Sequence, residues 1–174
     1  MVEQASHKCQ VAGSIPAGPT TAMIITELYP KQQRGYNQIL DELDIPFLIY
    51  YSTSLWLPAI RLRQLRITWA DQSEPDWLGL CTHDNTHKHI HIELAGRGVR
   101  DQLIYTLFHE LVHAQQWHSG KLRYRNGHWY WNGDATKKQP TRLSLAQYRA
   151  LPWESEADHL AETICTALHK DQLI

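Results

Sequence analysis

The sequence lacks the features that define several classes of protein. Its three cysteines, Cys9, Cys81 and Cys165, are far apart and form no C-x-x-C pair, which argues against a thiolate zinc knuckle and a disulfide framework. No run approaches the ~20 consecutive apolar residues of a membrane-spanning helix. The N-terminus has no basic segment followed by an apolar one, so no secretory signal is visible. We therefore expect a cytoplasmic protein without a membrane partner.

Charge of one sign is not in excess either. The 17 Lys and Arg residues nearly balance the 18 Asp and Glu residues, and the formal net charge is -1 at pH 7. No overall basic field favours nucleic acid, and no acidic excess points to a solvated tail. Arg61, Arg63 and Arg66 interleave with Leu62 and Leu65. A solvated strand face explains this pattern better than nucleic-acid binding, which we do not expect.

The 174 residues, 43% of them hydrophobic, suffice for one domain with a core. Residues 1–22 are rich in small residues, Gly and Pro and have no apolar periodicity, which predicts a disordered N-terminal extension. One hypothesis for this extension is that translation naturally begins at Met23; the alternative is an ordinary flexible tail. Residues 23–174 then form the folded domain.

The spacing of apolar residues predicts an α+β fold. A helix is expected over residues 33–43 and strands over 47–51, 65–69, 77–81 and 89–94. In the last strand His89, His91 and Glu93 alternate with apolar residues, and we expect it to border the active-site cleft with its histidines facing solvent. Because the strands precede a long helix instead of alternating with helices, we expect a mostly antiparallel sheet packed on that helix. Downstream, Asn126-Gly127 predicts an aromatic hairpin, residues 143–150 a helical turn, and residues 153–169 a final helix.

The long helix, residues 103–117 (LIYTLFHELVHAQQW), carries an H-E-x-x-H motif. His109 and His113 are four residues apart, about 40° and one turn on a helix, so their imidazoles point to the same side. Two converging imidazoles suit one Zn²⁺ ion, and Glu110 beside them suits the general base of a metal-assisted hydrolysis. The helix also carries one apolar stripe that we expect to be buried: Leu103, Leu107, Leu111 and Ala114.

A catalytic zinc site needs a third protein ligand, and the last helix offers two carboxylates. The apolar face of that helix is formed by Ala157, Ala161, Ile164 and Leu168. Glu154 lies about 60° from the centre of this face and Glu156 about 100°. Glu154 is therefore the preferred ligand, with His128 and Glu156 as alternatives. Asp158, one turn after Glu154, suits a hydrogen bond to a ligand histidine.

HELVH, followed far downstream by LPWESEAD, resembles the small zinc metallopeptidases of the gluzincin type. The likeness is greatest to phage and prophage proteins whose last helix opens with P-W-E-x-E-A, and it covers residues 90–168. It implies a zincin-like fold for residues 23–174, with Zn²⁺ bound by His109, His113 and Glu154 and with Glu110 as the base. It also implies a protein or peptide substrate in the cytoplasm of a bacterial or phage-infected cell.

Two other families are similar in fewer features. The ImmA/IrrE group, which cleaves repressors, shares H-E-x-x-H and a downstream E-x-x-A-[ND] helix, but the helix-turn-helix module that it usually carries is not seen. The SprT-like group, linked to DNA–protein crosslink repair, uses a third histidine after the motif. His128, 15 residues beyond His113, falls roughly at that position. The cysteine-rich zinc ribbon of that group is absent.

These residues predict a zinc-dependent metallopeptidase. Zinc would lower the pKa of its bound water toward ~7, and Glu110 would take the proton as the water attacks a peptide carbonyl. Tyr148, Tyr130 and His128 are candidate oxyanion donors, and for Tyr148 a packing role is the favoured interpretation. The alternatives are a zinc-stabilised, non-catalytic binding or virion-associated protein and a SprT-like DNA-associated protease.

Overall fold

The computed structural model describes residues 24–25, 43–60, 64–70, 78–84, 89–95, 99–136 and 143–174. The predicted extension over residues 1–22 and, except for Leu43, the predicted helix over residues 33–43 lie outside these ranges. The helices of the described residues are α2 (Ile45–Leu55), α3 (Arg100–Ser119), α4 (Leu145–Arg149) and α5 (Pro152–Lys170). The strands are β1 (Ile24–Ile25), β2 (Leu65–Ala70), β3 (Gly79–His83), β4 (Ile90–Ala95), β5 (Leu122–Arg125), β6 (His128–Trp131) and β7 (Asp134–Ala135).

Two sheets confirm the predicted α+β class. The larger has the strand order β1-β2-β4-β3, and the smaller is the meander β5-β6-β7. Among the described strands, three of the five pairings are antiparallel. The sheet that packs on α3 was expected to be mostly antiparallel, but two of its three described pairings are parallel. β4 lies between β2 and β3, pairing parallel with β2 and antiparallel with β3, and β1 is parallel to β2.

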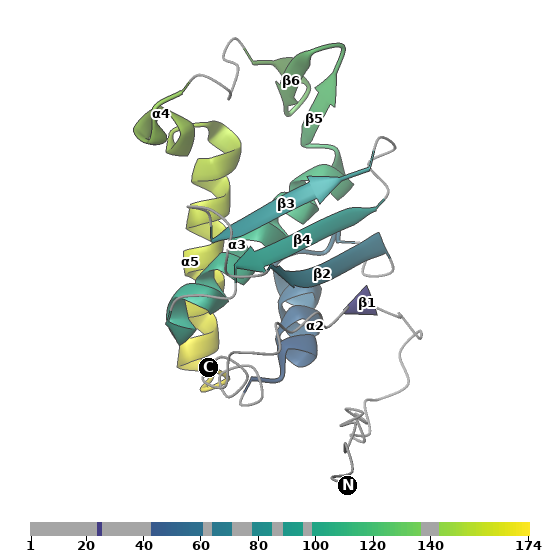
Figure 1. Ribbon diagram of the computed structural model, residues 1–174. Coiled ribbons are helices and arrows are strands. Elements are labelled where there is room, and N and C mark those ends of the chain that lie inside the picture. Colours follow the sequence, from purple (N-terminus) through teal and green to yellow (C-terminus); the bar gives the residue numbers. More distant parts are fainter. Residues whose placement is uncertain are drawn as a thin grey trace, which may run out of the picture.

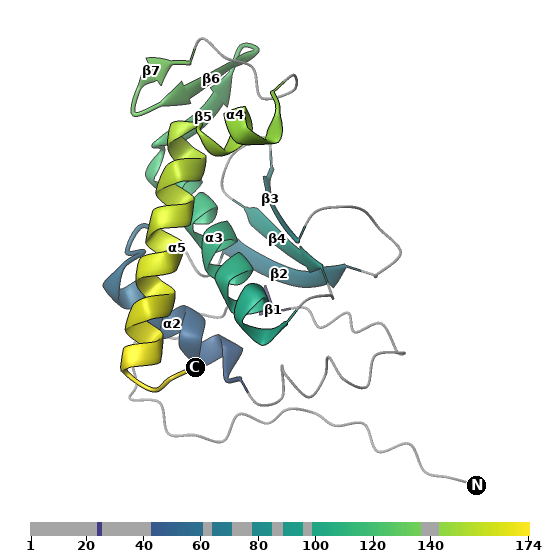
Figure 2. The same cartoon turned by 90° about the vertical axis from the view of Figure 1, so that its left-hand side faces the viewer.

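Helix α3 lies between the larger sheet and α5, and α2 covers the same face of the sheet (Figures 1 and 2). The predicted apolar stripe from Leu103 to Ala114 is buried. Because α3 is enclosed on two sides, residues off the stripe, including Phe108 and Val112, are fully buried as well. A helix held in this way presents its polar residues in a fixed geometry.

The strand predicted over residues 47–51 is wrong, because these residues belong to α2. Asp44 accepts a hydrogen bond from the backbone N–H of Phe47 at 3.0 Å and caps the helix. Pro46 lies in the first turn of α2, where proline is tolerated. A short apolar run fits a buried helix as well as a buried strand, and here the capping residue decides between them.

Helix α5 and the hairpin agree with the sequence. The predicted face of α5, Ala157, Ala161, Ile164 and Leu168, is fully buried. Asn126 and Gly127 have φ values of 53° and 79°, the positive angles that a type I′ turn requires. Two hairpin tryptophans, Trp129 and Trp131, contact Trp153, with ring centroids 5.7 and 6.3 Å away. The hairpin thus packs on the first turn of α5.

None of the helices among the described residues has the length and hydropathy needed to cross a membrane.

Candidate metal centre

Three side chains from two helices converge where α3 meets the first turn of α5. His109 Nε2 and His113 Nε2 are 3.1 Å apart, and each lies 3.4 Å from Glu154 Oε2. The histidines meet because they are four residues apart on α3, and Glu154 meets them because the apolar face of α5 turns it inward. These three residues form the group that could hold a metal ion in the described part of the chain.

The spacing of the three atoms fits a small tetrahedral ion. Two ligand atoms that are both about 2.05 Å from a tetrahedral zinc ion lie roughly 3.3 Å apart. The three separations between His109, His113 and Glu154 are 3.1, 3.4 and 3.4 Å. Two imidazole nitrogens and one carboxylate oxygen are also a donor set that zinc accepts, and three protein ligands leave a fourth position open.

The second nitrogen of each histidine lies close to an oxygen of another side chain, as is typical of metal-binding histidines. His109 Nδ1 lies 3.0 Å from Asp158 Oδ1, which places Asp158 where a supporting residue was predicted. The same oxygen accepts a hydrogen bond from the Tyr105 hydroxyl at 2.9 Å. On the other histidine, Nδ1 of His113 lies 2.9 Å from Gln116 Oε1. Both imidazoles are therefore oriented with Nε2 toward the centre.

The electrostatics favour an ionised carboxylate at this point. Burial by itself raises the pKa of Glu154, but hydrogen bonds from His109 and His113 outweigh it and hold the pKa at about 2. In turn, burial lowers the pKa of His113, and the Glu154 carboxylate more than reverses this, so that its pKa is raised. The centre is thus a buried cluster in which the negative charge of Glu154 favours a positive charge on His113, and a metal cation could take the place of that proton.

Glu110 lies next to this cluster and is only 6% exposed. Burial raises its pKa, and the neighbouring histidines offset part of the shift. Its carboxylate accepts a hydrogen bond from the backbone N–H of Cys81 on β3. The close approach of β3 depends on Gly79, because a Cβ there would lie 2.7 Å from Glu110 Oε1. A glycine therefore makes room for the predicted base.

The structure brings one further predicted residue to the centre and leaves others outside. The hydroxyl of Tyr148, on α4, donates a hydrogen bond to the Glu154 carboxylate, and burial together with that carboxylate raises its pKa. Glu156 instead contacts Lys121 and accepts a hydrogen bond from Gln116 at 3.1 Å. His128 is exposed on β6 and lies outside the metal-binding group. Of the three predicted oxyanion donors, only Tyr148 has a described contact with the three converging side chains.

Strand β4 does not border the centre as expected, because it is enclosed by β2 and β3. Its alternation is confirmed: Ile90, Ile92 and Leu94 are buried, and His91 lies on the opposite face. His91 Nε2 lies 2.7 Å from Thr68 Oγ1 on β2. The strand that meets Glu110 is β3, the end strand of the described sheet.

Sequence reasoning missed three residues that surround the centre: Gly79, Tyr105 and Gln116. Tyr105 is four residues before His109 and Gln116 three after His113, so helical spacing could have placed both on the ligand-bearing side of α3. Gly79 carried no such signal, since its role depends on how β3 is placed against α3.

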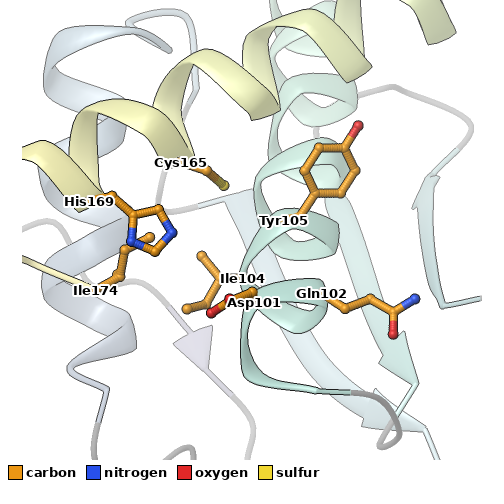
Figure 3. Close-up of a pocket in the computed structure, with 7 residues that line it drawn as sticks. All are labelled: Asp101, Gln102, Ile104, Tyr105, Cys165, His169 and Ile174. Carbon is orange, nitrogen blue, oxygen red and sulfur yellow. The ribbon is translucent and has the colours of Figure 1, made fainter.

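A cavity of about 400 Å³ lies elsewhere, between the first turns of α3 and the last turns of α5 (Figure 3). It is lined by Asp101, Gln102, Ile104, Tyr105, Cys165, His169 and Ile174. None of the three converging side chains lines it. Tyr105 links the cavity to the centre, because it lines the cavity and its hydroxyl donates a hydrogen bond to Asp158.

Comparisons with protein-family models, with curated proteins and with solved structures gave no match for this chain.

Proposed function

We propose that this protein is a zinc-dependent metallopeptidase in which His109, His113 and Glu154 hold one Zn²⁺ ion and Glu110 is the general base. The observation that carries the proposal is the near-equilateral triangle of Nε2, Nε2 and Oε2 atoms, with separations of 3.1 to 3.4 Å. The buried Glu110 carboxylate beside it supports a hydrolytic use of the metal rather than a purely structural one.

The residues then have separate tasks. Bound zinc supplies a Lewis acid that lowers the pKa of a water molecule toward ~7. Glu110 takes a proton from the water that attacks the substrate carbonyl and passes it to the leaving amine. Its raised pKa suits this task, because a base works best when its pKa approaches the working pH. The hydroxyl of Tyr148, already at Glu154, is available as a donor to the oxyanion that develops on the carbonyl.

The position of β3 supports a peptide as the substrate. β3 is the last strand of the described sheet, and its Gly79 and Cys81 adjoin Glu110. An end strand presents backbone donors and acceptors that an extended peptide can pair with. A peptide bound in that way would pass directly by the base and the three proposed ligands.

Metal analysis of the purified protein and its variants tests the ligand set. Wild type is expected to retain one equivalent of zinc, and His109→Ala and Glu154→Ala are expected to lose it. His128→Ala is the matched control and is expected to retain zinc, because His128 lies outside the group. Retention by Glu154→Ala together with loss by His128→Ala would overturn the ligand set and favour the SprT-like arrangement.

Hydrolysis of a library of fluorescence-quenched peptides tests the enzymatic part. Glu110→Gln is expected to keep its zinc and lose cleavage, because the amide has the shape of the base but cannot accept the proton. If wild type holds zinc but cleaves no better than Glu110→Gln on any peptide or protein offered, the metallopeptidase proposal fails. The zinc-stabilised, non-catalytic protein would then be the better account.

A further inference from the structure

Gln116 is a completely buried polar residue beside the proposed centre, with 0% exposure. Its Oε1 lies 2.9 Å from His113 Nδ1. Its Nε2 donates to the backbone carbonyl of Trp153 at 2.9 Å and to Glu156 Oε2 at 3.1 Å. The two N–H groups of the amide and its oxygen are thus all engaged, and they connect His113 on α3 with Trp153 and Glu156 at the start of α5.

We propose that Gln116 is a positioning residue, which selects the tautomer of His113 and holds the first turn of α5 in place for Glu154. The inference rests on the proposed function, since it concerns the same metal centre. An amide oxygen at His113 Nδ1 stabilises the tautomer with the proton on Nδ1, which leaves the lone pair of Nε2 for a metal. The bond to the Trp153 carbonyl holds the residue directly before Glu154.

The side-chain amide of Gln116 cannot flip by 180°, because both groups near its nitrogen are hydrogen-bond acceptors. With the amide reversed, its oxygen would face the Trp153 carbonyl and the Glu156 carboxylate, and its N–H groups would face His113 Nδ1. Glu156 is itself held by contact with Lys121, whose ammonium lies 5.3 Å from the centre of the Trp131 ring. The orientation of the Gln116 amide is therefore fixed in part by Glu156 and Lys121, which lie beside the hairpin. This orientation in turn determines the tautomer of His113.

Burial makes this arrangement costly to change. A buried amide that loses a partner keeps the full desolvation cost of the unpaired group. Replacement of Gln116 by methionine, which has a similar length and no amide, removes the contact at His113 Nδ1 and the side-chain hydrogen bond to the Trp153 carbonyl. The expected result is a histidine that reaches the metal in either tautomer and a less constrained Glu154.

The affinity for Zn²⁺ itself, measured by competition with a chromophoric chelator, tests the inference without any substrate. Loss of a partner that orients a metal-binding histidine typically weakens metal binding about 10- to 100-fold, and we expect a Kd raised by that factor in Gln116→Met. Gln115→Met is the matched control. Gln115 is the adjacent residue on α3, but it binds the Ala59 N–H at 3.1 Å and the Trp56 carbonyl at 3.4 Å, away from the centre.

The Gln115→Met control distinguishes a specific effect of Gln116 on the metal centre from a general loss of packing in α3. Gln115→Met is expected to lower the thermal stability of the metal-free protein and to leave the Kd for Zn²⁺ at the wild-type value. Equal Kd values for wild type and Gln116→Met, or equal weakening in both variants, would overturn the inference and leave the proposed function intact. Failure of the wild type to bind Zn²⁺ would overturn both.

A second measurement needs no variant and decides the case if Gln116→Met does not fold. In ¹⁵N-histidine-labelled wild type loaded with Zn²⁺, long-range ¹H–¹⁵N correlations identify which nitrogen of His113 carries the proton. We expect the proton on Nδ1 and the metal on Nε2. A proton on Nε2, with the metal on Nδ1, would contradict a role for Gln116 in selecting the tautomer.

Discussion

At Gly79, the addition of a single methyl group is expected to slow catalysis strongly without changing zinc binding. Its backbone passes so close to Glu110 that a methyl group there would lie 2.7 Å from Oε1 and 2.8 Å from Cγ. Unstrained non-bonded heavy atoms lie about 3.5 Å apart, so Gly79→Ala must displace Glu110 by roughly 0.8 Å. Because a ~1 Å misplacement of a reacting group can cost about 10²-fold in rate, we expect turnover to fall by roughly that factor.

Zinc affinity distinguishes a displaced Glu110 from a general disruption of the site in Gly79→Ala. The three atoms nearest to the added methyl belong to Thr106 and Glu110, and none belongs to a proposed metal ligand. Gly79→Ala is therefore expected to bind zinc with the affinity of the wild type. The assay compares zinc affinity with the rate of cleavage of the quenched peptide that the wild type cleaves fastest.

A second substitution identifies which contact matters. The added methyl would also lie 2.6 Å from Cγ2 of Thr106, and Thr106→Ser removes that atom while leaving Glu110 unchanged. The double variant Gly79→Ala/Thr106→Ser is expected to remain as slow as Gly79→Ala. Recovery of wild-type turnover in the double variant, or full activity in Gly79→Ala itself, would refute displacement of Glu110 as the cause.

Three further predictions concern the metal, pH and the hairpin. Asp158→Ala is expected to weaken zinc binding about 10-fold or more by chelator competition, because it removes the carboxylate that lies 3.0 Å from His109 Nδ1. An equal loss in His159→Ala, a change at the exposed next residue, would count against this. The pKa of Glu154 is held at about 2 in the folded metal-free protein, below its ordinary value of 4.5, so its ionisation contributes stability that is lost as the pH falls from about 4.5 toward 2. Glu154→Gln is therefore expected to flatten the pH dependence of the free energy of unfolding in that window, measured by urea denaturation, and an unchanged slope would show that the carboxylate is not the cause. Trp129→Ala removes ring contacts with three aromatic residues and is expected to destabilise the protein by about 2 kcal/mol in thermal denaturation, whereas a change below ~0.5 kcal/mol would mean that the hairpin is not packed as described.

The two helices that build the centre could be predicted because their roles depend on helical spacing alone. The four-residue interval between His109 and His113 fixes their common side, and the apolar residues of α5 fix the inward side of Glu154. Neither inference required knowledge of which elements pack together. The burial of Glu154, with 4% exposure, is the observation that the helical phase of α5 had predicted.

What could not be predicted depends on contacts between distant parts of the chain. The strand order that places β4 inside the sheet and β3 beside Glu110 follows from pairing, and residue periodicity does not determine pairing. The apolar run from Phe47 to Tyr51 has no period that separates a helix from a strand, and the sequence reasoning did not consider Asp44 as a helix cap. Glu156 appeared to be a candidate ligand because its partners, Gln116 and Lys121, are more than 30 residues away.

The packing of the hairpin on α5 also gives the protein an optical reporter of its own. Of the seven tryptophans, Trp117, Trp129, Trp131 and Trp153 form one chain of ring contacts. Trp153 directly precedes Glu154, and its carbonyl binds Gln116. Indole emission depends on the surrounding charges, and excitation passes readily between rings less than 7 Å apart. Any ion that repositions the Glu154 turn should therefore change the intrinsic fluorescence of the whole cluster, so that occupancy of the centre can be followed without a label.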